Sequence, residues 1–392
     1  LDQMGGAVAF IERLPDQFPE AASAPRAELA AAAGRAAQNL RDFAVFLRED
    51  LLPRSDGKFA IGAAGVQALL DAEEMIDVPV ADILTRLYRD LEKVNGQIAA
   101  LADRIAPGEP VAQVIERMRA VHAAPEGLKE SLEAECRRIR ASLVAHDFLT
   151  IPPEMPDVIV QAMPDYADGG GAMRTPGPFE LVAQESYLQL QIPKPNWPAE
   201  RLQGLWSDFN HYGLVLLVIH ECYPGHHTQF YLQKRVPLPA SRDHDSDSNS
   251  DGWAEYAKFA FVEQVLAPTD PFYQFAALLS KRSYIAAAIA GLEIHLEKRT
   301  LEQASDFLMQ WQGRTRANTY IWVLNRATHY PTHLTYYIGS EMVRKLRDDY
   351  RSLRGADFSL KEFHDRFMSY GLIPIRVIRQ DMLGNADDGV LF

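Results

Sequence analysis

Apolar side chains recur at the spacing of one helix face through most of the first 150 residues. Residues 27–51 show this period, and a second segment repeats it with Val80, Ile83, Leu84, Leu87 and Leu91. Gly57 and the stretch 59–62 separate the two segments, and prolines at 107, 110 and 125 interrupt the chain again. The pattern predicts an N-terminal helical region over residues 1–150.

The pattern changes between residues 151 and 198, where nine prolines and a run of three glycines accumulate. Between them lie two short β-branched or alternating runs, at 158–160 and 187–191. Prolines and glycines in this density are typical of loops and turns. We therefore expect a small insert of strands and loops over 151–198, with its strands near 155–192.

Helical spacing returns after the insert and continues to the C-terminus. Thr300 with Gln303, and Ser359 with Glu362, have the Ser/Thr-x-x-Glu/Gln form of a capping box, which marks two helix starts. Residues 241–250 are rich in Asp, Ser and Asn and are predicted to form a solvated loop. We expect a second helical region over 199–392 and a mainly α protein overall.

Charge and composition narrow the classes of partner. The chain of 392 residues has a net charge of −13 and no dense block of Lys or Arg, which argues against nucleic acid and anionic membranes as partners. No apolar run reaches about 18 residues, so no transmembrane segment is predicted. Two cysteines allow a single disulfide but no disulfide framework. A cytoplasmic location and export after loss of a signal peptide both fit.

An apolar run at residues 214–219 leads directly into His220 and Glu221. Such a run predicts a buried helix that carries a polar pair to its end, and burying an unpartnered Glu beside a His is costly. A bound metal removes this cost, because neutral imidazoles bind zinc and an adjacent carboxylate can take a proton from zinc-bound water. The pair therefore predicts a metal centre.

The second histidine of this centre is ambiguous from spacing alone. Pro224 stands where the usual His-Glu-x-x-His motif has its second histidine. On a regular helix, a residue seven positions later lies within about 20° of the starting face, whereas one six positions later is about 120° away from it. A regular helix would therefore pair His220 with His227 and not with His226. Pro224 and Gly225 disfavour a regular helix, and a bulge of two residues would return His226 to the same face.

A third ligand is expected on a second helix, within Asp-Gly-Trp-Ala-Glu-Tyr at 251–256. Asp251 and Glu255 are four residues apart and share a helix face. One of them could bind the metal while the other orients a ligand, and the spacing does not choose between them. Trp253 is predicted to pack this helix against the first.

The two motifs together resemble a bacterial family. His-Glu-Cys-Tyr-Pro-Gly-His-His-Thr-Gln at 220–229 and the motif at 251–256 are similar to the paired motifs of the family known as "domain of unknown function 885". Shorter likenesses follow at 291–295, 300–307, 336–339, 363–364 and 371–374, so the resemblance spans most of residues 60–385. That family in turn resembles helical zinc metallopeptidases such as the thermostable carboxypeptidases and oligopeptidases. The resemblance implies a multi-helical body with a cleft between the N-terminal and the catalytic helices.

The resemblance also implies a zinc cofactor, with His220 and His226 as ligands and Glu221 as general base. The family's glutamate at the third ligand position falls on Asp251, whose side chain is one methylene shorter, so Glu255 is the alternative ligand. The implied reaction is hydrolysis of peptide bonds in short peptides by metal-activated water, as an exopeptidase or an oligopeptidase.

Residues near the C-terminal motifs are candidate substrate contacts. The resemblance gives Tyr336 the role of hydrogen-bond donor to the tetrahedral oxyanion. His329 and His333 lie four residues apart and could face the site, although packing or surface positions are equally compatible with that spacing. Arg326 and Arg376 could bind a substrate carboxylate, although exposed arginines more often solvate a helix face.

Two rival functions are compatible with a helical protein of this composition. A di-iron bundle requires two Glu-x-x-His motifs, and the chain instead has Glu-x-His at 293–295 and 362–364, each one residue too short. A metal-free or catalytically weak protein that binds peptides is the alternative to the peptidase, because Asp251 departs from the family's glutamate. The oligomeric state does not follow from the sequence.

Overall fold

The computed structural model describes residues 2–18, 23–122, 127–164, 171–180, 182, 184–192, 209–312, 316–328 and 332–392. Helices dominate these ranges and one small sheet accompanies them, which confirms the mainly α fold with a small β insert. The chain divides into two compact units, one of Leu1–Lys58, Gln161–Ala172 and Gln189–Ile192, and the other of the remaining residues.

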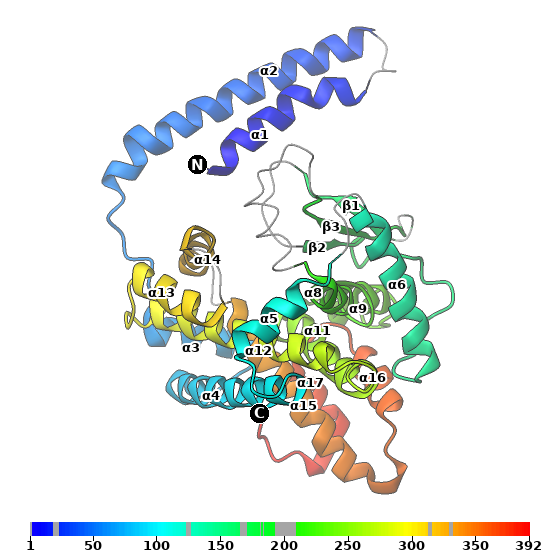
Figure 1. The fold of residues 1–392 in the computed structure, drawn as a ribbon. Coiled ribbons are helices and arrows are strands. Elements are labelled where there is room, and N and C mark those ends of the chain that lie inside the picture. Colours follow the sequence, from blue (N-terminus) through cyan, green and yellow to red (C-terminus); the bar gives the residue numbers. More distant parts are fainter. Residues whose placement is uncertain are drawn as a thin grey trace. The chain divides into compact units, whose positions relative to one another are not determined.

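The first unit is built around a helical hairpin. Its helical segments are α1 (Asp2–Arg13), η1 (Leu14–Gln17), α2 (Ser23–Phe46), η2 (Leu47–Leu51) and η3 (Leu52–Arg54). Helices α1 and α2 lie side by side in Figure 1, and an ion pair between Arg41 and Glu12 joins them. The small residues Ala33 and Ala37 of α2 are buried.

The second unit contains the long core helices. Its N-terminal part comprises α3 (Gly62–Glu74), α4 (Val80–Ile105), α5 (Val111–Arg119) and α6 (Leu128–Ala145). Its central part comprises α8 (His211–Leu217), η5 (Val218–Cys222), α9 (His226–Gln233), α10 (Pro239–Asp243), α11 (Asp247–Phe261), η6 (Val262–Leu266) and α12 (Pro271–His295). Its C-terminal part comprises α13 (Leu301–Gln312), α14 (Arg316–Thr328), α15 (Thr332–Arg354), η7 (Gly355–Asp357), α16 (Leu360–Met368), α17 (Ile375–Leu383) and η8 (Gly384–Ala386).

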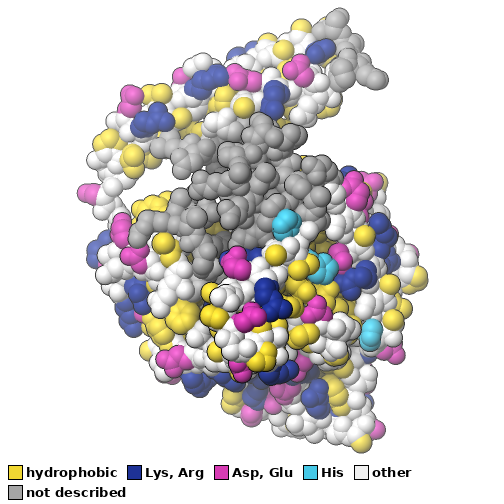
Figure 2. All heavy atoms as spheres, viewed as in Figure 1, with side chains coloured by type: hydrophobic (Ala, Val, Ile, Leu, Met, Phe, Trp, Pro, Cys, Tyr) yellow, Lys and Arg dark blue, Asp and Glu magenta, His cyan; other side chains and the backbone are white. Residues whose placement is uncertain are grey.

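Helix α12 forms the centre of this unit, packed against α4, α13 and α15 (Figure 1). Residues 284–295 of α12 are all buried, which explains their almost continuous apolar sequence. Among the described helices, only α12 is long and apolar enough to cross a membrane by length and composition, and 67% of its most apolar window is buried inside the protein. No clear transmembrane segment is therefore found. On the face drawn in Figure 2, acidic and basic side chains are interspersed over the described residues.

Helices α11 and α15 approach each other closely at Gly252 and Gly339. A Cβ atom added to Gly252 would lie 2.5 Å from the Cα atom of Gly339, and one added to Gly339 would lie 1.9 Å from the carbonyl oxygen of Ser248. Neither position admits a side chain without moving a backbone. The pair of glycines therefore sets how closely α15, which carries Tyr336, approaches α11, which carries Asp251.

The insert forms a three-stranded sheet with the order β1-β3-β2, where β1 is Ile159–Ala162, β2 is Gly171–Arg174 and β3 is Tyr187–Leu190. The runs at 158–160 and 187–191 were predicted as strands, and the structure confirms both. The Ile159 amide donates to the Ser186 carbonyl, and the Met163 amide donates to the Leu190 carbonyl. The residue numbers of the donors at β1 and of the acceptors at β3 increase in the same direction, so the two strands are parallel. Strand β2 was not predicted, because it opens on a glycine and lacks a β-branched run.

The two capping boxes are confirmed as helix starts. The Gln303 amide donates to Thr300 Oγ1 over 3.2 Å, and the Thr300 amide donates back to Gln303 Oε1 over 2.9 Å, immediately before α13. Ser359 accepts in the same way from the amide of Glu362 at the start of α16. Reciprocal bonds of this kind satisfy amides that have no partner within the helix.

The prediction of a solvated loop over 241–250 is wrong. Most of this stretch is helical, in α10 and in the first turn of α11, and the side chains of Ser248 and Asn249 are completely buried. Ser246 caps α11 by accepting from the amide of Asn249, and the hydroxyls of Ser246 and Ser248 donate to the buried carboxylate of Glu74. The polar residues therefore satisfy one another inside the protein, through a partner on α3 that is 172 residues away from Ser246.

Candidate metal centre and adjoining cavity

The helix that carries the first motif breaks after Cys222. Helix α8 starts with Asn210 as its cap, widens into the π-helical turn η5, and ends before Gly225, where α9 begins. The Gly225 amide donates to the Ile219 carbonyl over 3.1 Å, and a Cβ atom at Gly225 would lie only 1.6 Å from the carbonyl oxygen of His220. Only glycine allows this approach, and the break replaces the regular helix that would have favoured His227.

The break brings His226 to His220. Their ring centroids are 4.8 Å apart and the ring planes are perpendicular. His227 points elsewhere, with Nε2 3.0 Å from the Pro156 carbonyl oxygen. Burial lowers the pKa of His227 to about 4, so this imidazole is neutral and packs within the protein. Of the two histidines that spacing left open, His226 is the one that shares a site with His220.

Helix α11 places Asp251 opposite the two imidazoles. Asp251 Oδ1 is 3.3 Å from His226 Nε2 and 4.0 Å from His220 Nε2. One potential ligand atom from each of these three residues lies within 4.8 Å of the others. Tetrahedral zinc with bonds of about 2.0–2.1 Å holds its ligand atoms about 3.3 Å apart. The three residues are therefore spaced to share one zinc ion, with a slightly wide gap at His220.

Glu255 lies behind His220 rather than among the three converging atoms. Its Oε1 is 3.0 Å from His220 Nδ1 and 2.6 Å from the ammonium of Lys258. Burial opposes ionisation of Glu255, but the charge of Lys258 and the contact with His220 lower its pKa to about 2. The ionised carboxylate lies close enough to Nδ1 to orient the imidazole, although the pair is outside hydrogen-bond geometry, and Nε2 remains for a metal.

The surroundings of the three candidate ligands are rich in negative charge. Burial and the charge of Asp251 raise the pKa of Asp247 to about 6. Burial lowers the pKa of His226, but its hydrogen bond with Asp251 and the nearby carboxylates outweigh this effect and raise that pKa overall. Carboxylates that oppose one another's ionisation indicate a local excess of negative charge, which a divalent cation would neutralise.

Glu221 and Tyr336 flank the centre on the side of a cavity. The Met173 amide of strand β2 donates to Glu221 Oε2 over 3.1 Å, so the small sheet positions this carboxylate. The ring of Tyr336 stacks on His220 with centroids 5.8 Å apart, and His333 stacks on Tyr336 at 5.0 Å. Burial, followed by the charges of Asp251 and Glu221, raises the pKa of Tyr336 far above its usual value. Its hydroxyl therefore keeps its proton and can donate a hydrogen bond.

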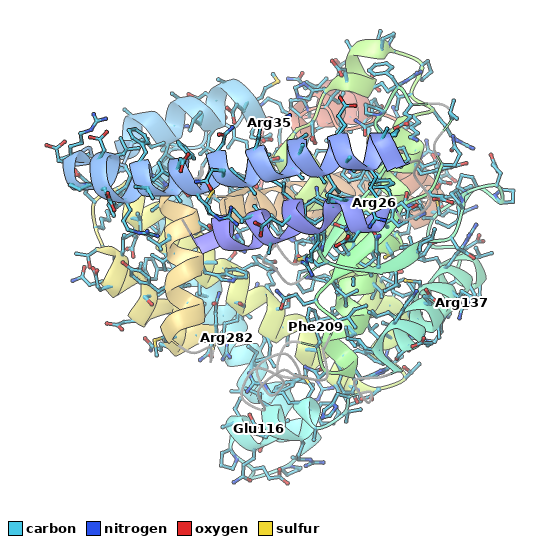
Figure 3. All side chains as sticks on the ribbon, turned by 90° about the horizontal axis from the view of Figure 1, so that it is seen from above. Arg26, Arg35, Glu116, Arg137, Phe209 and Arg282 are labelled. Atoms are coloured by element: carbon cyan, nitrogen blue, oxygen red, sulfur yellow. The ribbon has the colours of Figure 1, made fainter. Side chains whose placement is uncertain are left out.

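The cavity has a volume of about 640 Å³, within the range typical of small-ligand pockets. It is lined by α5 from the N-terminal part of the second unit and by α8, η5, α11, α12, α13, α14 and α15. Phe209, Glu116 and Arg282, labelled in Figure 3, are lining residues from three different segments. His220, Glu221, Tyr336 and His333 also line it, so the candidate metal centre opens into this space.

The sequence comparisons agree with the resemblance of the motifs. The family described as "Bacterial protein of unknown function (DUF885)" matches residues 1–382. The chain belongs to this DUF885 family. No curated protein matches the chain.

Two solved structures, both described as a "putative lipoprotein", have a similar fold. One, from Shewanella oneidensis and described as of unknown function, is 22% identical with a TM-score of 0.77 over 97% of this chain and 71% of its own. The other, from Colwellia psychrerythraea, is 17% identical with a TM-score of 0.82 over 97% of this chain and 66% of its own. At these identities the likeness shows the fold alone.

Three predicted substrate contacts differ in their placement. His333 lines the cavity, whereas Arg326 donates to His333 Nδ1 over 2.7 Å and lies over the ring of Trp322, 4.8 Å from its centroid. Arg326 therefore contacts two residues that line the cavity but is not itself among the described lining residues. Arg376 forms an ion pair with Asp77 and is not among the described residues that line the cavity. His329 lies outside the described residues.

Sequence reasoning missed three cations of the cavity, Arg119, Lys258 and Arg282. Lys258 follows Glu255 by three residues, and this i,i+3 spacing could have indicated the ion pair between them. Arg282 lies in α12, far along the sequence from either motif, and no local signal marks it. Trp253 was predicted to join the two motif helices, and its indole does donate to the Pro224 carbonyl over 2.9 Å.

The two cysteines lie beside this region but remain thiols. Cys136 Sγ and Cys222 Sγ are 3.8 Å apart, and both side chains are buried. Burial raises the pKa of the Cys222 thiol well above its usual value, so it is not activated as a nucleophile. Cys222 is therefore a packing neighbour of the candidate metal centre.

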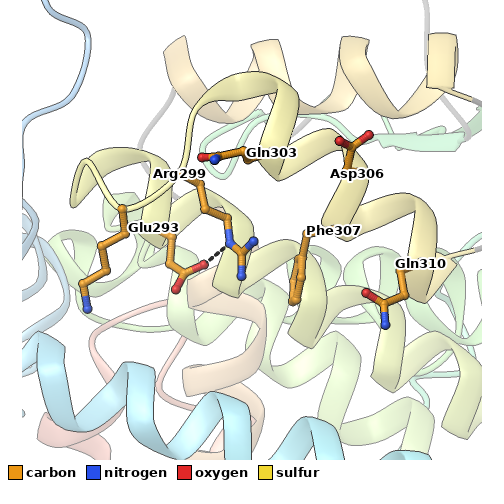
Figure 4. Close-up of a pocket in the computed structure, with 7 residues that line it drawn as sticks. Glu293, Arg299, Gln303, Asp306, Phe307 and Gln310 are labelled. Atoms are coloured by element: carbon orange, nitrogen blue, oxygen red, sulfur yellow. Dashed lines mark hydrogen bonds and ion pairs between the residues drawn. The ribbon is translucent and has the colours of Figure 1, made fainter.

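A second cavity of about 460 Å³ lies between the end of α12 and α13 (Figure 4). Its central Arg299 forms an ion pair with Glu293, donates to Tyr88 over 3.1 Å, and lies 4.5 Å from the centroid of the Phe307 ring. Tyr88 in turn donates to Glu293 over 2.9 Å. The polar groups of Arg299, Glu293 and Tyr88 are thus already engaged with one another, and this cavity shows no comparable set of converging ligands among its described residues.

Proposed function

We propose that this protein is a zinc-dependent peptidase that hydrolyses short peptides. The observation that carries the proposal is the convergence of His220, His226 and Asp251, with ligand atoms within 4.8 Å of one another, beside a cavity of about 640 Å³ that His220 lines. Glu221, which follows the first imidazole directly, lines the same cavity.

The donor set fits zinc. Two imidazoles and one carboxylate are the protein ligands of many catalytic zinc sites, which keep a fourth position for water or substrate. The carboxylates around the centre supply the negative charge that such a cation requires. When bound, zinc supplies a Lewis acid that polarises a carbonyl and lowers the pKa of water.

The chain's own residues supply the remaining steps. Glu221, held by the Met173 amide, takes the proton of the attacking water at its carboxylate and passes it to the leaving amine. Tyr336 keeps its phenolic proton and donates a hydrogen bond to the carbonyl oxygen as negative charge develops there. Glu255 holds His220 in orientation through Nδ1.

The size of the cavity supports short peptides as substrates. A volume of about 640 Å³ accommodates a few residues and excludes a folded protein. This favours action as an exopeptidase or oligopeptidase. A metal-free or catalytically weak peptide-binding protein is the second candidate, favoured by the 4.0 Å gap between Asp251 and His220 Nε2, which exceeds the ideal spacing.

We further propose that the protein is exported, because the two solved proteins of the same fold are described as lipoproteins. Fractionation of cells that express the complete gene would test this. Recovery of the protein in the cytoplasmic fraction alone would contradict it.

Metal analysis and a peptide-library digest test the peptidase proposal together. Purified protein should contain about one zinc per chain, and cleavage should stop with a chelator and return with added zinc. Glu221→Gln should retain the metal while kcat falls roughly 10²–10⁴-fold. Binding of peptides by a metal-free protein without any cleavage would favour the second candidate instead. Cleavage that persists in the chelated protein or unchanged in the variant would refute the mechanism.

A further inference from the structure

Three of the residues that line the large cavity are Lys or Arg, and one of them differs from the other two. Arg119 pairs with Glu116 at 2.9 Å, and Lys258 pairs with Glu255 at 2.6 Å. Arg282 has no carboxylate partner among the described residues. The cavity therefore contains a cation whose charge is not balanced by a neighbour in the described part of the chain.

The guanidinium of Arg282 is desolvated as well as unbalanced. Among the described residues, its guanidinium makes one hydrogen bond, donated by Nη1 to Asn95 Oδ1 over 3.2 Å, and its Nε is buried without a partner there. Burial lowers the pKa of Arg282, which reflects the cost of keeping the charge there. Arg282 is half-buried, and a partly desolvated cation without a counter-charge is stabilised when a ligand supplies one.

The neighbouring wall carries further unsatisfied polar atoms. Trp311 Nε1 and Gln312 Oε1 are buried without partners within the described ranges, and both residues line the same cavity. Gln312 is fixed by donating to the Ser283 carbonyl over 3.2 Å. Two N–H donors, on Arg282 and Trp311, suit the oxygens of an anion, and the amide oxygen of Gln312 suits a peptide N–H.

We propose that Arg282 binds the C-terminal carboxylate of the substrate, so that the enzyme acts at the carboxyl end of short peptides. The inference rests on the proposed peptidase function. The cavity that Arg282 lines also contains Glu221 and His220. Because a space of this size holds only a few residues, the carboxylate closest to the scissile bond of a short peptide is its own C-terminus. The carboxylate of an acidic side chain has the same chemistry and is the competing source.

Binding to a zinc-loaded Glu221→Gln protein tests the assignment without turnover. Three probes are titrated by calorimetry: the N-acetylated tripeptide Ala-Leu-Phe as the free acid, its C-terminal amide, and Ala-Leu-Glu as the amide. The free acid should bind on the order of 10–100-fold more tightly than either amide, the range expected for hydrogen bonds to a charged group. Equal binding of acid and amide would overturn the assignment, and preferential binding of the Ala-Leu-Glu amide would assign Arg282 to acidic side chains instead.

Substitutions then show whether the preference for the free acid depends on Arg282. In the same background, Arg282→Gln should abolish the difference between acid and amide, and Arg282→Lys should restore part of it. Arg117→Gln is the matched control, because Arg117 is exposed on α5, pairs with Glu109, and does not line the cavity. A preference that survives Arg282→Gln would overturn the role of this residue. If that variant does not fold, the comparison of acid with amide on the unaltered cavity still decides whether an anion site exists.

The same probes separate this inference from the peptidase proposal. Zinc-dependent cleavage of peptides by the wild-type protein without any preference for a free carboxylate would refute only the role of Arg282. A preference that depends on Arg282, in a protein that cleaves no peptide with or without zinc, would refute only the hydrolytic function and leave a carboxylate-binding site.

Discussion

Two buried clusters of charged side chains differ in whether their polar groups are satisfied. Around Arg379, three guanidinium nitrogens donate at 2.6 Å to Asp349, Asp387 and Asp388. Lys345 adds a second cation beside two of these aspartates, Asp349 and Asp388. Every nitrogen of Arg379 therefore has an acceptor, and its side chain is almost completely enclosed.

The centre around His226 has the opposite character. Its described carboxylates outnumber its cations, because Lys258 is the one ammonium beside Asp251, Glu221 and Glu255. Nδ1 of His226 is buried without a partner among the described residues, and the group opens into a cavity. A closed cluster stabilises a fold, whereas an open one with an unbalanced charge has room for a ligand. The contrast predicts that changes in the first cluster alter stability and changes in the second alter metal binding.

Substitution of Arg379 should have the largest effect on folding. Arg379→Met removes a buried cation from three carboxylates that are partly exposed to solvent. Loss of these charge-assisted hydrogen bonds should cost about 1–3 kcal/mol in the free energy of unfolding. Urea unfolding followed by tryptophan fluorescence measures the change. Arg376→Gln is the control, since its ion pair with the exposed Asp77 should contribute only about 0–1 kcal/mol. If the Arg379→Met protein stayed folded but lost zinc, the prediction that the Arg379 cluster affects only stability would be wrong.

Substitution of Asp251 should act on metal affinity. Structural zinc sites with four ligands bind with about 10–16 kcal/mol, so one ligand contributes on the order of 3–4 kcal/mol, or about 10²–10³-fold. Asp251→Ala should weaken zinc binding by this amount in competition with a chromophoric chelator. Asp247→Ala, one turn earlier in α11, removes a carboxylate outside the three candidate ligands and should change the affinity less than about tenfold. Equal losses in both variants would mean that only net charge matters.

A smaller effect distinguishes the position of Glu255 from that of a ligand. Glu255→Gln keeps a contact with His220 Nδ1 but removes the charge that orients the ring, which should weaken zinc binding about 10–100-fold. The same chelator competition measures it, and the metal-free variant should remain folded by circular dichroism. If Glu255→Gln weakened zinc binding as much as Asp251→Ala, Glu255 would be the metal ligand and Asp251 the residue beside it.

Much of this arrangement could be predicted from local sequence. The apolar run before His220, the capping boxes and the alternating strands are local signals, and the structure confirms the elements that they mark. The adjacency of His220 and Glu221, and the shared face of Asp251 and Glu255, depend only on chain geometry. The sequence also contained the Pro224–Gly225 break, but the choice of His226 over His227 depends on the approach of Gly225 to the His220 carbonyl, which spacing does not reveal.

The remainder depends on partners distant in sequence. The polar stretch at 246–249 is indistinguishable from a solvated loop until Glu74 of α3 is placed beside it. No local sequence signal singles out Arg282. It differs from the other arginines because no carboxylate lies beside it in space among the described residues. Arg376 and Arg326 were equally plausible by residue type, yet one pairs with Asp77 and the other with His333. Residue type indicates which side chains could bind a carboxylate, but only the packing of the fold decides which of these arginines faces the cavity.

The smallest predicted effect concerns a histidine that, unlike His226, is fully satisfied. His364 Nδ1 donates to the Phe148 carbonyl over 2.7 Å, and its Nε2 accepts from the Tyr256 hydroxyl over 2.9 Å, an arrangement that requires the neutral ring. Burial lowers the pKa of His364 to about 3, below its unfolded value of about 6.5. Between these values only the unfolded chain takes up the proton, so this stabilisation is present above pH 6.5 and is lost as the pH falls toward 3.

This residue should therefore lower the free energy of unfolding by about 1.3 kcal/mol between pH 7 and pH 5.5. Urea unfolding of the wild-type protein and of His364→Asn at both pH values isolates the contribution, because the variant cannot titrate at this position. The wild-type protein should lose more stability than the variant over this interval by that amount. Equal losses of stability in both proteins would show that His364 is not held neutral in the folded state. The distinction between histidines whose hydrogen bonds are satisfied and histidines that are open to a ligand would then not hold for His364.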